Sequence, residues 1–324
     1  MKVSEVMHAW YGILAGRRPA LSIEITRECP LRCPGCYAYD SAHLGSGINL
    51  RQLSDFRGDD LVARILALVD EHRPQHLSLV GGDPLVRYRE LDELLPILNG
   101  RGVHVQVVTS AFRVIPRAWN DLDRLNIVVS IDGLAGEHDV RRKPATYERI
   151  LKNTSESRIT VHCTITSQIL QRDDYLEEFV DFWSMQPQTK RVWFSIFTPQ
   201  MNATDPEILS SAQRQFVMEE LLRLRDRFPL LDMNPMLIRE IMHPPSSPKE
   251  CIFAQTTTSI SADLKTRISP CQFGGNPDCS QCGCIASLGL AALGHYQPVP
   301  GVTAGRLFTI SQSIAKGLQA VGAA

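Results

Sequence analysis

Short segments rich in β-branched residues alternate with amphipathic helical patterns as far as residue 227 of the chain. The predicted strands are Leu21–Thr26, His76–Gly81, Val103–Ser110, Ile127–Asp132, Ile159–Thr166 and Arg191–Phe197. The predicted helices are Asp60–His72, Arg89–Leu98, Pro116–Leu125, Thr146–Ser155, Asp174–Met185 and Glu207–Arg227. This order predicts parallel strands joined by right-handed crossover connections.

Apolar and polar residues alternate within most of these strands. Ile23 and Ile25 flank Glu24 on the first strand, and Val161 precedes His162 on the fifth. A closed eight-stranded barrel fills its interior with apolar layers, whereas a polar inner face suits a cavity that binds a ligand. We therefore expect an α/β fold with an incomplete (βα)6 TIM-type barrel. A mixed sheet with one wet face is the alternative.

The pattern changes after Phe228. Prolines cluster between residues 242 and 250, and the stretch from Cys251 to Cys284 is rich in Ser, Thr and Cys. We divide the chain into a barrel over residues 1–228 and a cysteine-rich C-terminal extension over residues 229–324. Apolar residues at helical spacing near the end predict a helix docked on the core: Leu307, Ile310, Ile314, Leu318 and Val321.

Composition and charge exclude several classes of protein. The 324 residues include 34 Lys plus Arg and 35 Asp plus Glu, so a broad surface for binding DNA is not expected. No apolar run approaches the roughly 20 residues that cross a bilayer. Glu5, His8 and Arg17 interrupt any signal-peptide core. We expect a soluble cytoplasmic protein with no transmembrane segment.

Eight of the nine cysteines fall into two zones, and Cys163 lies alone between them. The first zone holds Cys29, Cys33 and Cys36. The second zone holds Cys251, Cys271, Cys279, Cys282 and Cys284. Thiols gathered in this way, in a chain with no predicted signal peptide, are typical of metal ligands rather than of a secreted disulfide framework.

The first zone directly follows the first predicted strand, so it lies at the carboxyl end of the sheet, where α/β proteins place their active sites. Cys29, Cys33 and Cys36 can hold three irons of a [4Fe–4S] cluster. No fourth cysteine follows nearby, which leaves one iron open to a ligand from outside the protein. A tetrahedral zinc site is the alternative.

The spacing of these three cysteines resembles the C-x3-C-x2-C signature of the radical S-adenosylmethionine (SAM) superfamily, and the resemblance extends through the first two hundred residues. It implies a [4Fe–4S] cluster whose open iron binds SAM. It also implies an oxidoreductase that cleaves SAM reductively to a 5′-deoxyadenosyl radical, which abstracts a substrate hydrogen. A flavodoxin or ferredoxin electron donor is expected. A small molecule, a lipid precursor or a short peptide is the expected substrate.

The same resemblance implies where SAM is held. Tyr37, the aromatic residue after the third cysteine, is expected near the adenine. Gly81-Gly82-Asp83-Pro84 stands where the family has a Gly-Gly-Glu-Pro motif that holds the methionyl ammonium. Because Asp is shorter than Glu, backbone contacts from Gly81 and Gly82 are expected ahead of a contact from Asp83.

Three further residues are assigned to SAM in the same way. Ser110 and Ser130, near the ends of the third and fourth predicted strands, are expected to contact it, and Arg142 is expected to meet its carboxylate. A guanidinium suits bidentate recognition of a carboxylate. A solvated face is the alternative for Arg142, because Arg141 and Lys143 flank it.

The second cysteine zone resembles the auxiliary-cluster extensions of SPASM and twitch type and those of adenosylhopane synthase-like members. An auxiliary iron–sulfur cluster is therefore expected, with the choice of four ligands among the five cysteines left open. Zinc is the alternative.

Glu24 and His162 are the predicted catalytic residues, because they are titratable groups on the inner face of the barrel. A carboxylate at Glu24 needs a partner if it is buried, and His104, His162 or the substrate are the expected ones. The alternative function is a non-catalytic iron–sulfur or zinc protein used for electron transfer or scaffolding.

Overall fold

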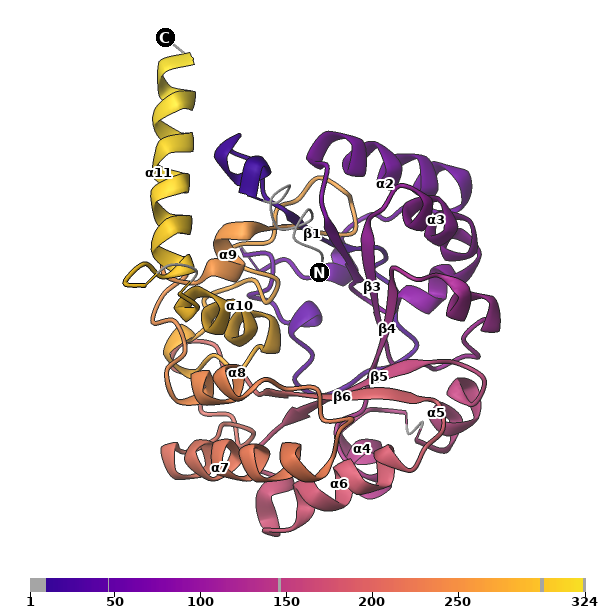
Figure 1. The fold of residues 1–324 in the computed structure, drawn as a ribbon. Coiled ribbons are helices and arrows are strands. Elements are labelled where there is room, and N and C mark those ends of the chain that lie inside the picture. Colours follow the sequence, from indigo (N-terminus) through magenta and orange to yellow (C-terminus); the bar gives the residue numbers. More distant parts are fainter. Residues whose placement is uncertain (1–9, 46, 145–146, 298–299, 323–324) are drawn as a thin grey trace.

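The computed structural model describes residues 10–45, 47–144, 147–297 and 300–322. Its centre is one curved sheet of seven parallel strands in the order β6-β5-β4-β3-β2-β1-β7, with helices on the outside (Figure 1). The strands are β1 (Ala20–Glu24), β2 (His76–Val80), β3 (His104–Thr109), β4 (Leu125–Ser130), β5 (Ile159–Ile165), β6 (Thr189–Ile196) and β7 (Thr257–Ile260). The predicted incomplete barrel is confirmed.

The described helices include counterparts of the predicted ones, apart from Pro116–Leu125, and four more that were not predicted, one after β4 and three in the extension. They are α2 (Gly58–His72), α3 (Tyr88–Gly100), α4 (Ala135–Arg141), α5 (Tyr147–Thr154), α6 (Tyr175–Ser184), α7 (Ser211–Arg227), α8 (Pro235–Arg239), α9 (Ile252–Thr256), α10 (Ile285–His295) and α11 (Ala304–Gly322). The α7 helix begins later than predicted because Ser210 caps it, accepting a hydrogen bond from the Gln213 amide. Thr146, the predicted start of α5, lies outside the described residues.

The predicted helix over Pro116–Leu125 is wrong. Only a short 3-10 turn forms at Arg117–Asp121, and Leu125 already begins β4. The buried Trp119 holds this turn in place, because its indole N–H donates to Asp92 Oδ1 at 2.6 Å. One turn of helix is therefore enough to connect β3 to β4.

The seventh strand was not predicted, and it comes from the C-terminal extension. Thr257 to Ile260 pair in parallel with Ala20 to Ile23, so residues beyond 228 extend the same sheet. Three of the four residues are Thr or Ser, and the strand is short, so its sequence carries no apolar alternation. The extension also closes the side of the barrel between β1 and β6, where α8, α9 and α10 lie (Figure 1).

The inner face of β1 is covered more completely than the sequence predicts. Leu21 and Ile23 pack into the core with the helices, and the alternating residues Ser22 and Glu24 are 2% and 1% exposed. The cover comes from β7 and from the long loop after β1, whose His43 contacts Glu24. The alternative of a wet sheet face is therefore wrong at this strand.

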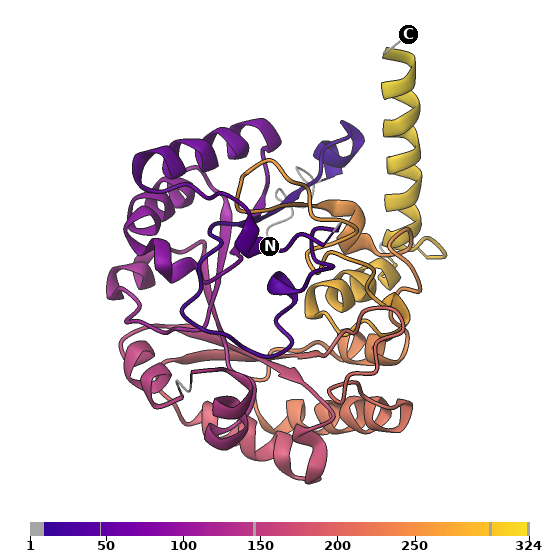
Figure 2. The same ribbon diagram turned by 180° about the vertical axis from the view of Figure 1, so that it is seen from behind.

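The C-terminal helix α11 does not dock along the core as predicted. Figures 1 and 2 show it pointing away from the body of the molecule. It packs against α10, where the Gly305 and Gly294 backbones approach closely, but Ile310 and Ile314 are about half exposed at 48% and 49%. The side chains of Leu318 and Val321 lie outside those described.

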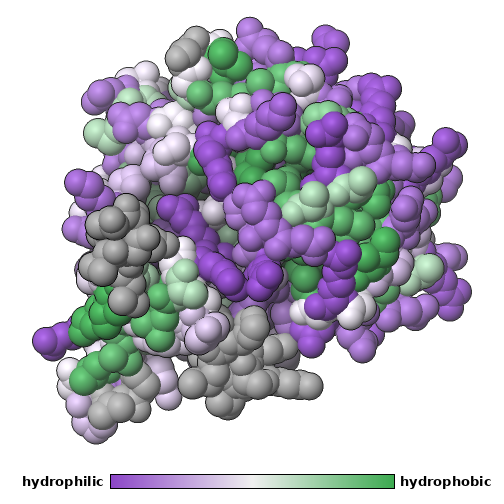
Figure 3. Space-filling model, turned by 90° about the horizontal axis from the view of Figure 1, so that it is seen from above, coloured by the Kyte–Doolittle hydropathy of each residue, from purple (hydrophilic) through white to green (hydrophobic). Residues whose placement is uncertain are grey.

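The surface seen from above is mixed, with hydrophilic side chains between separate hydrophobic patches (Figure 3). Across the described part of the chain, no helix combines the length and the apolar character needed to cross a membrane.

Candidate active site

The first cysteine zone lies in the long loop between β1 and α2, which runs across the mouth of the barrel (Figure 2). Cys29, Cys33 and Cys36 are all partly buried free thiols. The loop is held by the backbone: the Arg32 N–H donates to the Lys143 carbonyl at 2.6 Å, and Leu31 N–H donates to Cys29 Sγ at 3.4 Å. The three thiols are thus presented at the carboxyl end of the sheet, as predicted.

The charges around these thiols differ from one cysteine to the next. Burial raises the pKa of Cys29 to about 12, and the charge of Asp83 adds to the increase. Burial also raises the pKa of Cys36, although the Arg142 charge opposes it. As thiolates these groups need a cationic partner, and an iron–sulfur cluster bound by cysteine supplies one. The donor set therefore fits such a cluster.

A single metal ion would need its ligands close together. Within the described residues, no three His, Cys, Asp or Glu side chains gather closely enough to share one ion. A [4Fe–4S] cluster differs in this respect, because each of its irons takes its own thiolate.

Two glycines at the end of β2 allow the chain to pass against β1 and the cysteine loop. Gly81 and Gly82 have φ angles of +78° and +53°, in the left-handed region that favours glycine. A Cβ atom on Gly81 would lie 2.2 Å from Glu24 Cβ, and one on Gly82 would lie 2.1 Å from the Glu28 carbonyl oxygen. No larger residue fits either position, so the Gly-Gly turn is a packing requirement of this site.

The Asp83 carboxylate joins the ends of β2 and β3. It accepts hydrogen bonds from the Thr109 hydroxyl at 2.6 Å, the Ser110 amide at 2.8 Å and the Ser110 hydroxyl at 2.6 Å. The Leu85 amide donates to it at 3.0 Å. Burial raises the Asp83 pKa in spite of these donors. Asp83 and Ser110 therefore bind each other, and Asp83 orders the turn.

Arg142 lies among charged groups rather than on a solvated face, so that alternative is wrong. Its Nε donates to Asp132 Oδ2 at 2.7 Å, and its charge acts on Cys33 and Cys36. Arg141 also pairs with Asp132, and it binds both oxygens of Glu207 at 2.6 and 2.8 Å. Asp132 is buried, but the two guanidinium groups hold its pKa well below the usual range. Asp132 ends the fourth predicted strand but was not among the predicted site residues.

Ser130 and His162 are neighbours on the inner face, since their strands β4 and β5 pair at these two residues. His162 Nε2 lies 2.8 Å from Ser195 Oγ, which accepts a hydrogen bond from the Ile285 amide at 3.2 Å. The Ser195 hydroxyl hydrogen is then free to donate to His162. Burial lowers the His162 pKa to about 4, so the ring is neutral at pH 7.

Neither of the two histidines predicted as partners of Glu24 contacts it. Its Oε1 lies 2.9 Å from His43 Nε2, and the Ser261 hydroxyl donates to its Oε2 at 2.5 Å. His104 instead contacts Arg124 at 2.7 Å, at the opposite end of the sheet, where β3 begins. His43 and Ser261 carry no sequence signal, because each is an isolated polar residue outside any motif. A direct contact between Glu24 and substrate stays a prediction.

Tyr37 lies between the two cysteine zones. Its ring makes edge contacts with His43 at 5.6 Å and with Phe273 at 5.3 Å, measured between ring centroids. Burial raises its phenol pKa far above the usual value, so it stays protonated. Phe273 belongs to the extension and follows Cys271 by two residues. The loop after β1 and the extension therefore pack directly on each other at this tyrosine.

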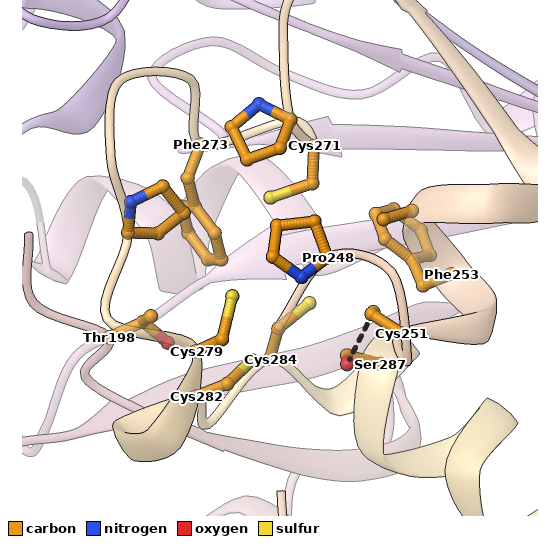
Figure 4. A pocket seen from close by; sticks show the side chains of 13 residues that line it. Thr198, Pro248, Cys251, Phe253, Cys271, Phe273, Cys279, Cys282, Cys284 and Ser287 are labelled. Atoms are coloured by element: carbon orange, nitrogen blue, oxygen red, sulfur yellow. Dashed lines mark hydrogen bonds between the residues drawn. The ribbon is translucent and has the colours of Figure 1, made fainter. Parts of the chain in front are cut away.

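The second cysteine zone forms one pocket. Figure 4 shows Cys251, Cys271, Cys279, Cys282 and Cys284 around it, together with prolines and the rings of Phe253 and Phe273. The sharp approach of Gly283 to β6, where a Cβ would lie 2.3 Å from the Ile196 carbonyl oxygen, brings Cys282 and Cys284 into place.

The thiols of Cys271, Cys279, Cys282 and Cys284 in this pocket have raised pKa values. Burial is the main cause, raising the pKa of Cys271 to about 12 and that of Cys279 to about 11, and the neighbouring thiols add to it. Cys251 Sγ also lies 3.2 Å from the Ser287 hydroxyl (Figure 4). Converging thiolates of this kind require a cationic centre, so this donor set also fits an iron–sulfur cluster.

Comparison with known proteins places this site in a family. The profile of the Radical SAM superfamily matches residues 23–183, which include the cysteine loop, the Gly-Gly turn and Arg142. PqqA peptide cyclase from Rhizobium meliloti (strain 1021) is 28% identical over 121 residues, which are 36% of this chain and 30% of that protein.

Solved structures share the fold. Streptococcus suis SuiB bound to S-adenosylmethionine aligns with a TM-score of 0.53 and 15% identity, over 80% of this chain and 60% of SuiB. SuiB bound to precursor peptide SuiA aligns with a TM-score of 0.56 and 15% identity, over 97% of this chain and 70% of SuiB. The structure of anSMEcpe with bound AdoMet aligns with a TM-score of 0.55 and 14% identity, over 83% of this chain and 80% of anSMEcpe.

The chain thus spans less than a third of the curated relative and about three fifths of SuiB in its SAM complex. The profile match covers the strands and loops that carry the first cysteine zone, and the partial barrel is the fold of the solved neighbours. The chain belongs to the radical SAM superfamily.

Proposed function

We propose that the protein is a radical SAM enzyme that modifies a peptide and carries an auxiliary iron–sulfur cluster in its C-terminal extension. One observation carries the proposal. The three cysteines of the loop after β1 lie beside the Asp83 turn, which follows β2, and beside Arg142, which ends α4 and is held by Asp132. Family membership supports the cofactors, a [4Fe–4S] cluster and SAM.

Cys29, Cys33 and Cys36 would hold the catalytic cluster. When bound, the cluster and SAM supply a 5′-deoxyadenosyl radical that removes a hydrogen atom from the substrate. Arg142 is positioned by Asp132 and presents a positive charge near Cys33, which suits the carboxylate of SAM. The task of Asp132 is to keep that guanidinium in place.

The Gly-Gly turn and the inner-face serines would bind the rest of SAM. The backbones of Gly81 and Gly82 offer contacts for its ammonium, since Asp83 is occupied by donors from β3. Ser130 lies on the inner face of β4, and Tyr37 lies beside the cysteine loop where the adenine is expected. The Ser110 hydroxyl is already bound to Asp83. Ser110 would therefore support SAM binding by fixing the end of β3, not by donating its own hydroxyl to SAM.

His162 is the inner-face residue that we assign to proton handling. Its neutral ring is hydrogen-bonded to Ser195 through Nε2, so it can exchange a proton with its surroundings. Ser195 Oγ also accepts a hydrogen bond from the amide of Ile285, the residue after Cys284. His162 therefore lies between the barrel interior and the second cysteine zone. We assign Glu24 to positioning, because it is 1% exposed and both its oxygens are bound within the protein.

The substrate class rests on the relatives. PqqA peptide cyclase is named for a peptide, SuiB has been solved with precursor peptide SuiA, and anSMEcpe has been solved with the Kp18Cys peptide. The electron donor would be a flavodoxin or a ferredoxin. We also propose a cytoplasmic location, because the nine cysteines are free thiols and suit a reducing compartment.

The test is anaerobic reconstitution followed by analysis of cofactor content and products. We expect about eight irons per chain, four for each cluster, and 5′-deoxyadenosine formed from SAM after reduction by dithionite. A Cys271→Ala variant should lose about half of this iron and keep the SAM-dependent change in the electron paramagnetic resonance spectrum. Stoichiometric zinc without colour, or no 5′-deoxyadenosine from the iron-loaded protein, would overturn the proposal.

A further inference from the structure

The cysteine loop has two faces with different surroundings. The charge of Asp83 interacts with Cys29, and the charge of Arg142 interacts with Cys33, on the side of the loop that faces the barrel. Cys33 and Cys36 also line an open pocket of about 340 Å³, and the described residues around it are Arg32, Cys33, Gly35, Cys36, Tyr39, Asp40 and Arg51. Asp83 and Arg142 are not among those residues. Two of the three cluster cysteines are therefore reached from an open pocket that neither Asp83 nor Arg142 lines.

Two cations line this pocket, which we call the outer pocket, and two more contact their backbones; we call Arg27, Arg32, Arg51 and Lys143 the outer patch. Arg32 and Arg51 are exposed and line the pocket. The carbonyl of the exposed Lys143 accepts the Arg32 amide at 2.6 Å, and Arg27 Nη1 donates to the Arg51 carbonyl at 3.3 Å. The four residues therefore lie together although they come from separate parts of the chain.

The outer patch keeps most of its positive charge. Asp40 is the carboxylate among the described residues that line the pocket, and its Oδ1 accepts a hydrogen bond from the Ala42 amide. Arg27 lies 3.9 Å from Asp55, but Arg87 already binds that carboxylate at 2.7 Å. On a chain with a formal net charge of −1, this is a local concentration of positive charge.

Arg51 is also held in place by its neighbours. Its guanidinium lies over the Tyr39 ring, 4.0 Å from the centroid, and the Tyr39 hydroxyl donates to the Arg27 carbonyl at 3.0 Å. A stacked guanidinium of this kind is ordered before a partner binds, so less side-chain freedom is lost on association. An ordered positive surface beside cluster cysteines suits a negatively charged protein.

We propose that the outer patch is the docking site of an acidic electron-donor protein of the flavodoxin class. This inference rests on the proposed function. One electron leaves the reduced donor and enters the enzyme through the Cys33 and Cys36 side of the loop, so the donor is oxidised by one electron. SAM and the substrate approach from the barrel interior, on the other face. Complementary charge accelerates such encounters at low salt.

The test compares a protein donor with a chemical one. In the Arg32→Glu, Arg51→Glu double variant we expect the flavodoxin-driven rate of 5′-deoxyadenosine formation to fall about tenfold or more at low salt. The dithionite-driven rate and the affinity for SAM should not change, because a small reductant needs no docking surface. The matched control is Arg149→Glu, Lys152→Glu, which reverses two exposed cations on α5 and should behave like the parent in every assay.

A second readout does not depend on activity. Calorimetric titration of flavodoxin into the reconstituted enzyme should show binding that weakens between about 20 and 200 mM salt, and the double variant should lose it. Equal flavodoxin-driven rates in parent and double variant would overturn the inference. So would a loss of both flavodoxin-driven and dithionite-driven activity, which would place the patch in cofactor support.

Two further outcomes separate this inference from its rivals. Loss of peptide turnover under dithionite, with flavodoxin binding kept, would assign the patch to an acidic substrate and overturn the inference. A parent enzyme that makes no 5′-deoxyadenosine with dithionite would overturn the proposed function instead. In that case salt-dependent flavodoxin binding by the parent, absent in the double variant, would still support the docking site.

Discussion

Glu24 and His43 form a buried pair in which both ring nitrogens of His43 face oxygen acceptors. His43 Nε2 lies 2.9 Å from Glu24 Oε1, and Nδ1 lies 2.9 Å from the Phe273 carbonyl oxygen. An imidazole that donates from both nitrogens is doubly protonated and positive. Burial alone would lower the His43 pKa, but the hydrogen bond and charge of Glu24 outweigh it and raise that pKa. The pair joins β1, the cysteine loop and the extension.

Glu24→Gln should destabilise the protein by about 2 kcal/mol at pH 6, because it removes the carboxylate charge that pairs with the buried His43 ring. The His43 pKa is raised on folding. Its stabilising effect is therefore fully present below the ordinary histidine value of about 6.5 and is lost as the pH rises through the raised value. Urea unfolding at several pH values should thus show a difference in the free energy of unfolding between parent and variant, and this difference should become smaller toward alkaline pH.

The matched control for this pair is Ser261→Ala. It removes the hydroxyl that donates to Glu24 Oε2 and leaves both charges in place. We expect a loss of about 1 kcal/mol that does not vary with pH. A gap for Glu24→Gln that stayed constant from pH 6 to pH 9 would show that the pair is not ionic.

Gly82→Ala should destabilise the fold by about 2–4 kcal/mol, because the new methyl group would meet backbone atoms that cannot move aside. At Gly82 a Cβ would lie 2.1 Å from the Glu28 carbonyl oxygen and 2.7 Å from that of Thr26, at a φ of +53°. Gly136→Ala is the control, since a Cβ there meets nothing within 4 Å and the residue is helical. Thermal unfolding should show a clearly lower melting temperature for Gly82→Ala and no such decrease for Gly136→Ala.

Cys33→Ala should abolish SAM cleavage while leaving the auxiliary pocket loaded, because the two cysteine zones are separate sites. Iron analysis should show a loss of about four atoms per chain. Formation of 5′-deoxyadenosine after reduction should vanish. A variant that still made 5′-deoxyadenosine at the parent rate would show that the active iron is held elsewhere.

His162 should titrate with a midpoint near 4 in the folded protein, since burial lowers its pKa to about that value. The unfolded chain takes up a proton on this residue below about pH 6.5, which the folded chain resists. Stability from this group is therefore present above pH 6.5 and declines as the pH falls toward 4. His162→Gln should lose less stability than the parent over that range. A ring signal that titrates near 6.5 by NMR would contradict the burial argument.

Local sequence determined most of the barrel and the catalytic loop. Six strands lie where the β-branched segments predicted them, because a strand buried against helices must place apolar residues at every second position. The spacing of Cys29, Cys33 and Cys36 is itself a local property, since all three belong to one loop. The Gly81-Gly82 turn could also be predicted from the sequence. The close approach of β1, which is the reason that glycine is needed there, could not.

Contacts between distant segments were decided by the tertiary structure alone. Ser261 lies 237 residues from Glu24 in sequence, and nothing near either residue predicts that they meet. The short strand at Thr257–Ile260 is extended because it pairs with β1, not because of its own composition. Likewise, only folding brings Cys251 to the other four cysteines of its pocket. The periodicity of a segment shows which of its faces is buried. Which distant segment it contacts depends on loop lengths and packing that no single segment encodes.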